Sequence, residues 1–166
     1  MSNKTYNVLF LCAGNAVRSI MAEALLNAAG GKRFRAFSAG SNPAGKVNPF
    51  AAEQVKAIGY APGDFRSKSW DEFSAPDAPS IDFVITVSDE AAGEPCPRWP
   101  GEPSTANWSF RDPAGVKGSE DDIRQAFFNI CCEIKTRLEI FRNLPTETLD
   151  EMAIQRRIAK IAKFQL

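Results

Sequence analysis

The most restrictive feature of this sequence is a short apolar run that leads directly into a loop and a helix. Residues Asn7 to Cys12 read NVLFLC, which is typical of a strand buried on both faces of a parallel sheet. A five-residue loop with Gly14 and Asn15 follows, and apolar residues then recur at helical spacing from Arg18 to Ala29. A second strand-like run, Phe34 to Ala39, completes a βαβ unit. Such a unit indicates an α/β fold.

The rest of the chain continues this alternation. Further helices are predicted from Asn48-Pro49 to about Ile58, from Ser119 to Asn143 and from about Thr148 to Lys163, with one helical turn near Ser69 to Phe73. Further strands are predicted at Ile81 to Val87 and at Asn107 to Phe110. We therefore expect an open, mostly parallel four-stranded sheet with helices on both faces, plus a C-terminal helical extension.

Composition removes several classes of function. The chain has 166 residues with 20 Lys+Arg and 20 Asp+Glu, so its net charge of zero implies no general attraction to nucleic acid or to an anionic membrane. It contains no histidine, which excludes Ser-His-Asp and Cys-His catalysis and zinc sites with imidazole ligands. Any nucleophilic or acid–base chemistry must use cysteine, carboxylates or other groups.

The four cysteines indicate a reducing compartment. Cys12, Cys96, Cys131 and Cys132 form no C-x-x-C pair, and the apolar run in MSNKTYNVLFLC is too short for a signal peptide or a membrane span. We expect a cytoplasmic protein with reduced cysteines and no metal site.

The segment CAGNAVRS has the composition of an oxyanion site. It places a cysteine at the carboxyl end of a strand and Arg18-Ser19 at the start of a helix, where α/β proteins bind ligands. Backbone N–H groups of the loop, the helix dipole and the Arg18 guanidinium could together hold a tetrahedral oxyanion and stabilise a Cys12 thiolate. Ser19 could donate a hydrogen bond to that thiolate. The candidate oxyanion-binding residues are Ala13, Gly14, Asn15, Ala16, Val17 and Arg18. A buried structural cysteine before a glycine turn is the alternative interpretation.

Asp112 is the candidate general acid. Without histidine a carboxylate is the natural proton donor for a leaving group, and Asp112 lies in an Asp-Pro-Ala-Gly loop just after a predicted strand. Aspartate before proline also commonly starts a turn, and taken alone this second interpretation is favoured.

Several motifs in order resemble one known family. CAGNAVRS, IMAEALLN, FSAGS, VNP, TVSD, CP and DPA look like the low-molecular-weight tyrosine phosphatase fold, and most like its arsenate reductase branch. The ordered match runs from about Tyr6 to Leu144. The resemblance implies that Cys12 is the nucleophile, residues 13–18 the oxyanion loop, Arg18 the clamp, Ser19 the thiolate partner and Asp112 the acid. It also implies a phosphatase-like catalytic domain over residues 1–145. In residues 146–166 the isoleucines Ile154, Ile158 and Ile161 form one stripe among basic residues, which predicts a helix that docks on the core as part of that domain or forms a dimer contact.

Departures from the family pattern bear on the chemistry. Phosphatase members usually carry tyrosines after the Asp-Pro pair, where this chain has Ala114 and Gly115. Thioredoxin-linked reductases carry a second redox cysteine directly after the strand that ends here at Val87, and a third in the next loop; this chain has Ser88 and Cys96. Val17 replaces a cysteine often found in the reductases' oxyanion loop.

The resemblance therefore favours arsenate reduction with a thiol reductant. Thioredoxin, glutaredoxin-glutathione and mycothiol are the candidate reductants, Cys96 is the candidate resolving thiol, and a redoxin is a candidate partner. A monovalent cation near Asn15, Glu23 and Ser38 is a candidate cofactor. The alternatives are a phosphatase that hydrolyses phosphomonoesters through a phosphocysteine and, more weakly, a non-catalytic oxyanion-binding module.

Overall fold

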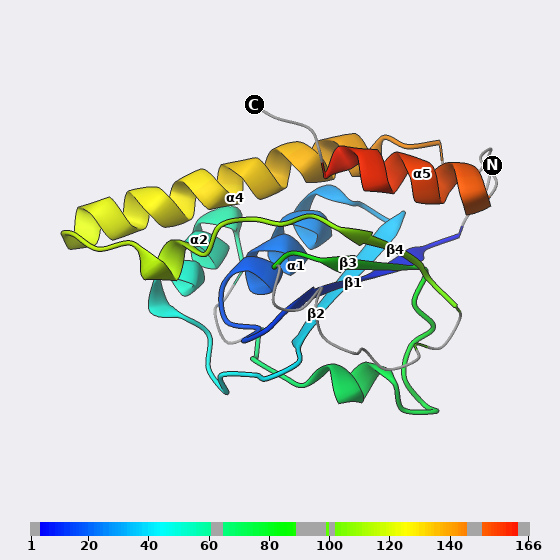
Figure 1. Cartoon of the computed structure of the whole chain (residues 1–166), viewed down its shortest axis with the longest axis horizontal. Coiled ribbons are helices and arrows are strands. Elements are labelled where there is room, and N and C mark those ends of the chain that lie inside the picture. Colours follow the sequence, from blue (N-terminus) through cyan, green and yellow to red (C-terminus); the bar gives the residue numbers. More distant parts are fainter. Residues whose placement is uncertain (1–3, 61–64, 89–98, 100–101, 146–150, 163–166) are drawn as a thin grey trace.

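Four parallel strands form one sheet in the order β2-β1-β3-β4 (Figure 1). The computed structural model describes residues 4–60, 65–88, 99, 102–145 and 151–162. The strands are β1 (Tyr6–Cys12), β2 (Phe34–Gly40), β3 (Phe83–Thr86) and β4 (Ser104–Asn107). The apolar run that opened the sequence is thus the central β1, with neighbours on both sides. This confirms the predicted open, parallel four-stranded α/β sheet.

The helices begin and end close to the predicted residues. They are α1 (Arg18–Ala29), α2 (Pro49–Ile58), α4 (Glu120–Arg142) and α5 (Glu151–Ile161), with the short 3₁₀ helices η2 (Trp70–Phe73) and η3 (Pro113–Gly115). The Asn48 side chain caps α2 ahead of Pro49. Ser119 and Asp122 form a reciprocal capping box at the start of α4. Because these signals are local, the first residues of the helices could be predicted well from the sequence.

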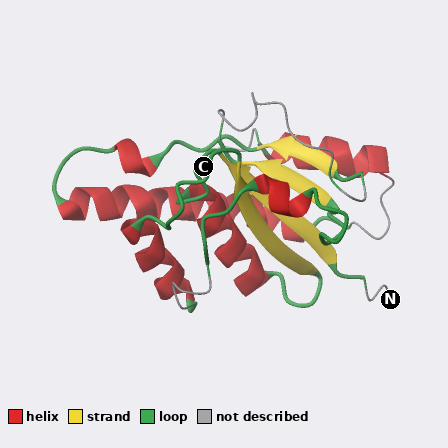
Figure 2. Ribbon diagram, turned by 90° about the horizontal axis from the view of Figure 1, so that it is seen from below, coloured by secondary structure: helices red, strands yellow, loops and turns green. Residues whose placement is uncertain are grey.

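Unequal layers cover the two faces of the sheet (Figure 2). On one face, the inward side chains of β1 and β3 share a core cluster with α1, α4 and α5, and α2 packs against α1 and α4. On the other face, Leu9 and Leu11 of β1 pack with Trp70 and Phe73 of η2 and with Trp99. All three tryptophans are buried. Of the adjacent cysteines of α4, Cys131 is buried and Cys132 is half-buried.

The last strand differs from the prediction. The expected strand was Asn107 to Phe110, whereas β4 spans Ser104–Asn107 and pairs with β3 from Phe83↔Ser104 to Thr86↔Asn107. As an edge strand of polar residues, β4 shows no apolar run that the sequence could reveal. The aromatic residues that suggested the later strand, Trp108 and Phe110, lie just beyond it and are buried.

Helix α5 covers the edge of the sheet beside β4. Its apolar residues Ile154, Ile158 and Ile161 are buried, while the basic residues between them are exposed, as the sequence pattern predicts. The carbonyl of Ile158 accepts a 2.9 Å hydrogen bond from the indole Nε1 of Trp108. The Gln155 side-chain amide pairs with both the backbone N–H and the carbonyl of Thr105 on β4. It thereby satisfies backbone groups that an edge strand otherwise leaves unpaired. Across the part of the chain that the structure describes, every helix is too short or too polar to cross a membrane.

Candidate active site

The candidate nucleophile lies at the carboxyl end of the central strand. Cys12 is the last residue of β1 and is only 3% exposed. Its Sγ atom lies 2.9 Å from the Oγ atom of Ser19 in the first turn of α1. Strand, loop and helix therefore fold back so that the cysteine meets the second residue of the helix.

The loop between Cys12 and Arg18 is held from outside through its carbonyl groups. The oxygens of Ala13, Gly14 and Ala16 accept hydrogen bonds from segment 42–48. The donors are the backbone N–H groups of Asn42, Ala44 and Asn48, at 2.9, 2.9 and 3.0 Å. In a trans peptide the N–H points away from the C=O, so the N–H groups that follow these carbonyls face the opposite side. N–H groups that share one side of a loop in this way can form an anion-binding concavity.

Asn15 sets the conformation of this loop. It is fully buried and adopts φ 44°, a left-handed conformation that asparagine tolerates better than most residues. Its Oδ1 accepts from the backbone N–H of Lys68 at 2.9 Å, and its Nδ2 donates to the Ser19 Oγ at 2.8 Å. Because the Ser19 oxygen accepts this bond, its own hydroxyl proton is available to the Cys12 sulfur. Gly14 does not adopt positive φ, so the reversal of this loop is made at Asn15.

Gly40 of β2 allows the loop to approach the neighbouring strand. Gly40 pairs with Cys12 in the sheet register. A Cβ at this position would lie 2.5 Å from the carbonyl oxygen of Ala13 and 3.0 Å from atoms of Asn15. Only glycine leaves room for the loop backbone here.

Arg18 and Asp112 meet across the mouth of the loop. Arg18 is 8% exposed, and its Nη1 donates a 3.0 Å hydrogen bond to the carbonyl of Phe110. Its Nη2 lies 3.7 Å from Oδ2 of Asp112, a carboxylate that is half-exposed. The other carboxylate oxygen, Oδ1, accepts from the N–H of Ala114 at 3.0 Å and caps η3. Asp112 therefore both starts a turn and faces the arginine, so the two interpretations of the sequence are compatible.

A buried charged pair lies behind the loop. The Oε1 atom of Glu23 accepts a 2.6 Å hydrogen bond from the Ser38 hydroxyl and lies 3.8 Å from the Lys68 ammonium. Burial raises the pKa of Glu23 and lowers the pKa of Lys68, which shows that each charge loses hydration here. The groups expected to bind a monovalent cation are thus engaged within the protein, because Asn15 Oδ1 and Glu23 Oε1 each accept a hydrogen bond and the Ser38 hydroxyl donates to Glu23. This arrangement fits a free cation poorly, because an ammonium group already lies against the carboxylate.

Several supporting residues could not be predicted from local sequence patterns. Residues 59–80 look irregular, yet Lys68 binds Asn15, and the Ser67 hydroxyl donates to the carbonyl of Gly14 at 3.0 Å. The Gly40 N–H donates to the carbonyl of Lys68 at 2.9 Å. These contacts join residues far apart in the chain, and no local pattern encodes them. Ser88 is buried just beyond β3. The candidate resolving thiol Cys96 lies outside the described residues.

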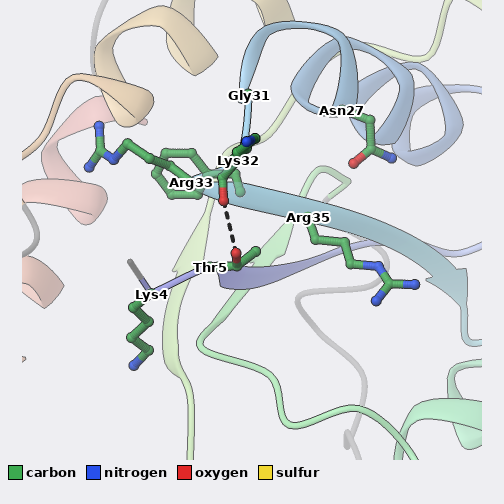
Figure 3. A pocket seen from close by; sticks show the side chains of 8 residues that line it. Lys4, Thr5, Asn27, Gly31, Lys32, Arg33 and Arg35 are labelled. Atoms are coloured by element: carbon green, nitrogen blue, oxygen red, sulfur yellow. Dashed lines mark hydrogen bonds between the residues drawn. The ribbon is translucent and has the colours of Figure 1, made fainter. Parts of the chain in front are cut away.

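A cavity of about 710 Å³ lies at the opposite end of the strands, near the amino ends of β1 and β2 (Figure 3). Lys4, Lys32, Arg33 and Arg35 contribute to its lining, and the Thr5 hydroxyl donates to the carbonyl of Lys32 across its floor. Its position is opposite to the carboxyl ends of the strands, where Cys12 lies.

Comparisons with known proteins agree with this geometry. A family model described as low molecular weight phosphotyrosine protein phosphatase matches residues 7–153. Arsenate reductase of Bacillus subtilis (strain 168) is 33% identical over 141 residues, covering 85% of this chain and 96% of that protein. The solved arsenate reductase from Archaeoglobus fulgidus DSM 4304 is 30% identical with a TM-score of 0.58, over 80% of this chain and 98% of that one. Corynebacterium glutamicum thioredoxin-dependent arsenate reductase Cg_ArsC1' is 26% identical with a TM-score of 0.56, over 84% of this chain and 63% of that one. Since the family model spans most of its length, the chain belongs to the low molecular weight phosphotyrosine protein phosphatase family.

Proposed function

We propose that this protein is a thiol-dependent arsenate reductase in which Cys12 is the nucleophile. The observation that carries the proposal is the 2.9 Å contact between Cys12 Sγ and Ser19 Oγ, inside a loop whose carbonyl groups accept hydrogen bonds from segment 42–48 on its outer side. In the proposed roles, residues 13–18 hold the oxyanion, Arg18 clamps it, Ser19 stabilises the thiolate and Asp112 supplies the proton. The names of the relatives support arsenate as the substrate.

The first step forms a bond between sulfur and arsenic. The Cys12 thiolate attacks the As(V) centre of arsenate, and one arsenate oxygen leaves as water after taking a proton from Asp112. The developing negative charge lies on oxygens that face the loop N–H groups and the Arg18 guanidinium. The product is an arsenic ester of Cys12.

The second step transfers two electrons. A second thiolate attacks the Cys12 sulfur, the S–As bond breaks with its electron pair moving to arsenic, and As(III) leaves as arsenite. The two sulfurs become a disulfide, so the oxidation of two thiols balances the reduction of arsenic. Ser88 cannot act as an intermediate thiol, and we propose that an external low-molecular-weight thiol attacks first, with Cys96 optional. Glutathione with glutaredoxin, mycothiol and thioredoxin are the candidate systems, and the cytoplasm, where such thiols stay reduced, is the proposed compartment.

A phosphatase is the second candidate function, because the same loop and acid serve phosphoryl transfer to cysteine. The family includes phosphotyrosine phosphatases by its description. The turn after Asp112 argues against aromatic phosphoesters, since its residues Ala114 and Gly115 offer no ring to pack against one. A purely oxyanion-binding module is weaker still, because such a module needs neither Cys12 nor Asp112.

Steady-state turnover separates these functions. We expect arsenate reduction, measured as arsenite released, to exceed hydrolysis of an aryl phosphate when each thiol system is supplied in turn. Aryl phosphate hydrolysis that is faster and needs no thiol would establish the phosphatase instead. Phosphate affinity without turnover in any assay would establish the binding module.

A further inference from the structure

We propose that Lys68 is a positioning residue whose ammonium group acts as an internal cation behind the oxyanion loop, so that the protein needs no free monovalent ion. This inference concerns the loop of the proposed reductase and rests on that function only for its activity readout. It follows from the contacts of the buried pair Glu23 and Lys68.

The pair is enclosed between the loop, α1 and β2. The side chains of Lys68 and Glu23 are only 10% and 13% exposed. Glu23 accepts the Ser38 hydroxyl from β2, and the Lys68 ammonium also donates a 3.2 Å hydrogen bond to the carbonyl of Arg66. Arg66 itself is exposed and forms an ion pair with Glu72, and its attraction for the Glu23 carboxylate is weaker than that of Lys68. Lys68 is therefore the cation that directly faces the Glu23 carboxylate.

The backbone of Lys68 also binds the loop and the neighbouring strand. The Lys68 N–H donates to Asn15 Oδ1, and its carbonyl accepts from the N–H of Gly40. Asn15 in turn donates to Ser19, whose oxygen contacts the Cys12 sulfur. A continuous chain of contacts thus runs from the Glu23–Lys68 pair to the candidate nucleophile.

Removing either charge has a predictable effect. A buried carboxylate that loses its cation is uncompensated, so it must take up a proton, recruit a cation from solvent or move toward water. Loss of the ammonium also removes its hydrogen bond to the Arg66 carbonyl, so the segment 66–68, which holds Asn15, loses an internal contact. While the Lys68 ammonium is present, a second cation at Glu23 is disfavoured by like-charge repulsion.

The test compares three proteins under two salts. We assay wild type, Lys68→Ala and a control variant, Lys32→Met, in KCl and in choline chloride at equal ionic strength. The control removes an exposed lysine near the amino ends of the strands, far from the loop. Arsenate turnover and the Kd for inorganic phosphate are both measured, so that the phosphate series remains informative if wild type does not reduce arsenate.

We expect wild type and Lys32→Met to behave alike in both salts. Lys68→Ala, which leaves space beside Glu23, should lose about 10-fold or more in kcat in choline, since a 1 Å misplacement can cost about 100-fold. Potassium ions should restore part of its kcat and its phosphate affinity. A potassium requirement in wild type, or a Lys68→Ala protein with full activity in choline, would overturn the proposal.

A second variant covers the case in which Lys68→Ala does not fold. Glu23→Gln with Lys68→Met removes both charges and keeps an amide acceptor for Ser38. We expect this double variant to fold and to show the same phosphate Kd in both salts. A potassium response that persists in the double variant would show that the cation acts elsewhere, and would contradict the assignment.

Discussion

The hydroxyl oxygen of Ser19 lies 2.9 Å from the sulfur of Cys12, although the two residues belong to a strand and a helix separated by a five-residue loop. Asn15 donates to the same hydroxyl oxygen, which leaves the serine proton for the sulfur. The loop therefore orients the Ser19 hydroxyl toward the Cys12 sulfur. A hydrogen bond to sulfur favours the nucleophilic form of a cysteine, and this one needs no histidine.

Replacing the nucleophile separates chemistry from binding. Cys12→Ser should abolish turnover of arsenate and of aryl phosphate, because a serine hydroxyl at this position has no thiolate form to attack with. The N–H groups of the loop and Arg18 remain, so phosphate affinity measured by calorimetry should be largely retained. Turnover well above background in Cys12→Ser would refute the assignment.

Asp112→Asn tests proton donation. We expect hydrolysis of aryl phosphates to slow by about 10²–10⁴-fold, as loss of a general acid usually causes. The loss should shrink as the leaving group becomes more acidic, because a good leaving group needs no proton. A series of aryl phosphates measures this dependence, and an equal loss across the series would count against the role of Asp112 as the acid.

The resolving step is tested at Cys96. We expect Cys96→Ser to keep full arsenate turnover with glutathione and glutaredoxin or with mycothiol and mycoredoxin, since an external thiol can attack the Cys12 adduct. Thioredoxin regeneration is compared in parallel. Loss of turnover with all three systems would identify Cys96 as the obligatory resolving cysteine.

Gly40→Ala should displace the loop, because the added methyl group would clash with the loop backbone. Its Cβ would approach the Ala13 carbonyl oxygen to 2.5 Å, so the loop backbone must shift. We expect a loss of about 1–3 kcal/mol in the free energy of unfolding, the usual cost of overpacking, together with weaker phosphate binding. Gly115→Ala is the matched control, because its Cβ would meet nothing within 4 Å, and its stability should change by less than about 0.5 kcal/mol. Equal unfolding midpoints for the two variants would show that the close approach of the loop to residue 40 does not limit the stability of the protein.

The buried thiol of Cys131 should make the protein less stable in alkaline solution. Burial raises the pKa of its thiol from 9.0 to about 11. Between these values the unfolded chain loses the proton while the folded protein keeps it, so stability is intact below pH 9 and falls as the pH rises toward 11. The loss should reach about 2–3 kcal/mol.

Urea unfolding at a series of pH values measures this effect in wild type and in Cys131→Ala. Lysines and tyrosines titrate in the same range in both proteins, so the difference between the two curves isolates the thiol. Parallel curves from pH 9 to 11 would mean that Cys131 does not titrate differently on folding.

The amino-acid sequence by itself determined the elements whose signals are local. The apolar run ending at Cys12, the proline after Asn48 and the capping residues at Ser119 each act within a few positions, so β1, α2 and α4 begin where expected. The same holds for the candidate nucleophile and its loop, because Cys12, Arg18 and Ser19 lie on one strand–loop–helix unit. The apolar stripe of α5 likewise predicted its buried face.

Only the tertiary structure decided what surrounds that unit. The edge strand β4 has no apolar run, and its position follows from pairing with β3 instead of from its own residues. Lys68 lies in a stretch without periodicity, yet it holds Asn15 across 53 positions. The need for glycine at position 40 depends on a carbonyl 27 residues earlier. These features arise from contacts between distant segments, and the free energy of such contacts depends on a geometry that exists only after the sheet has formed.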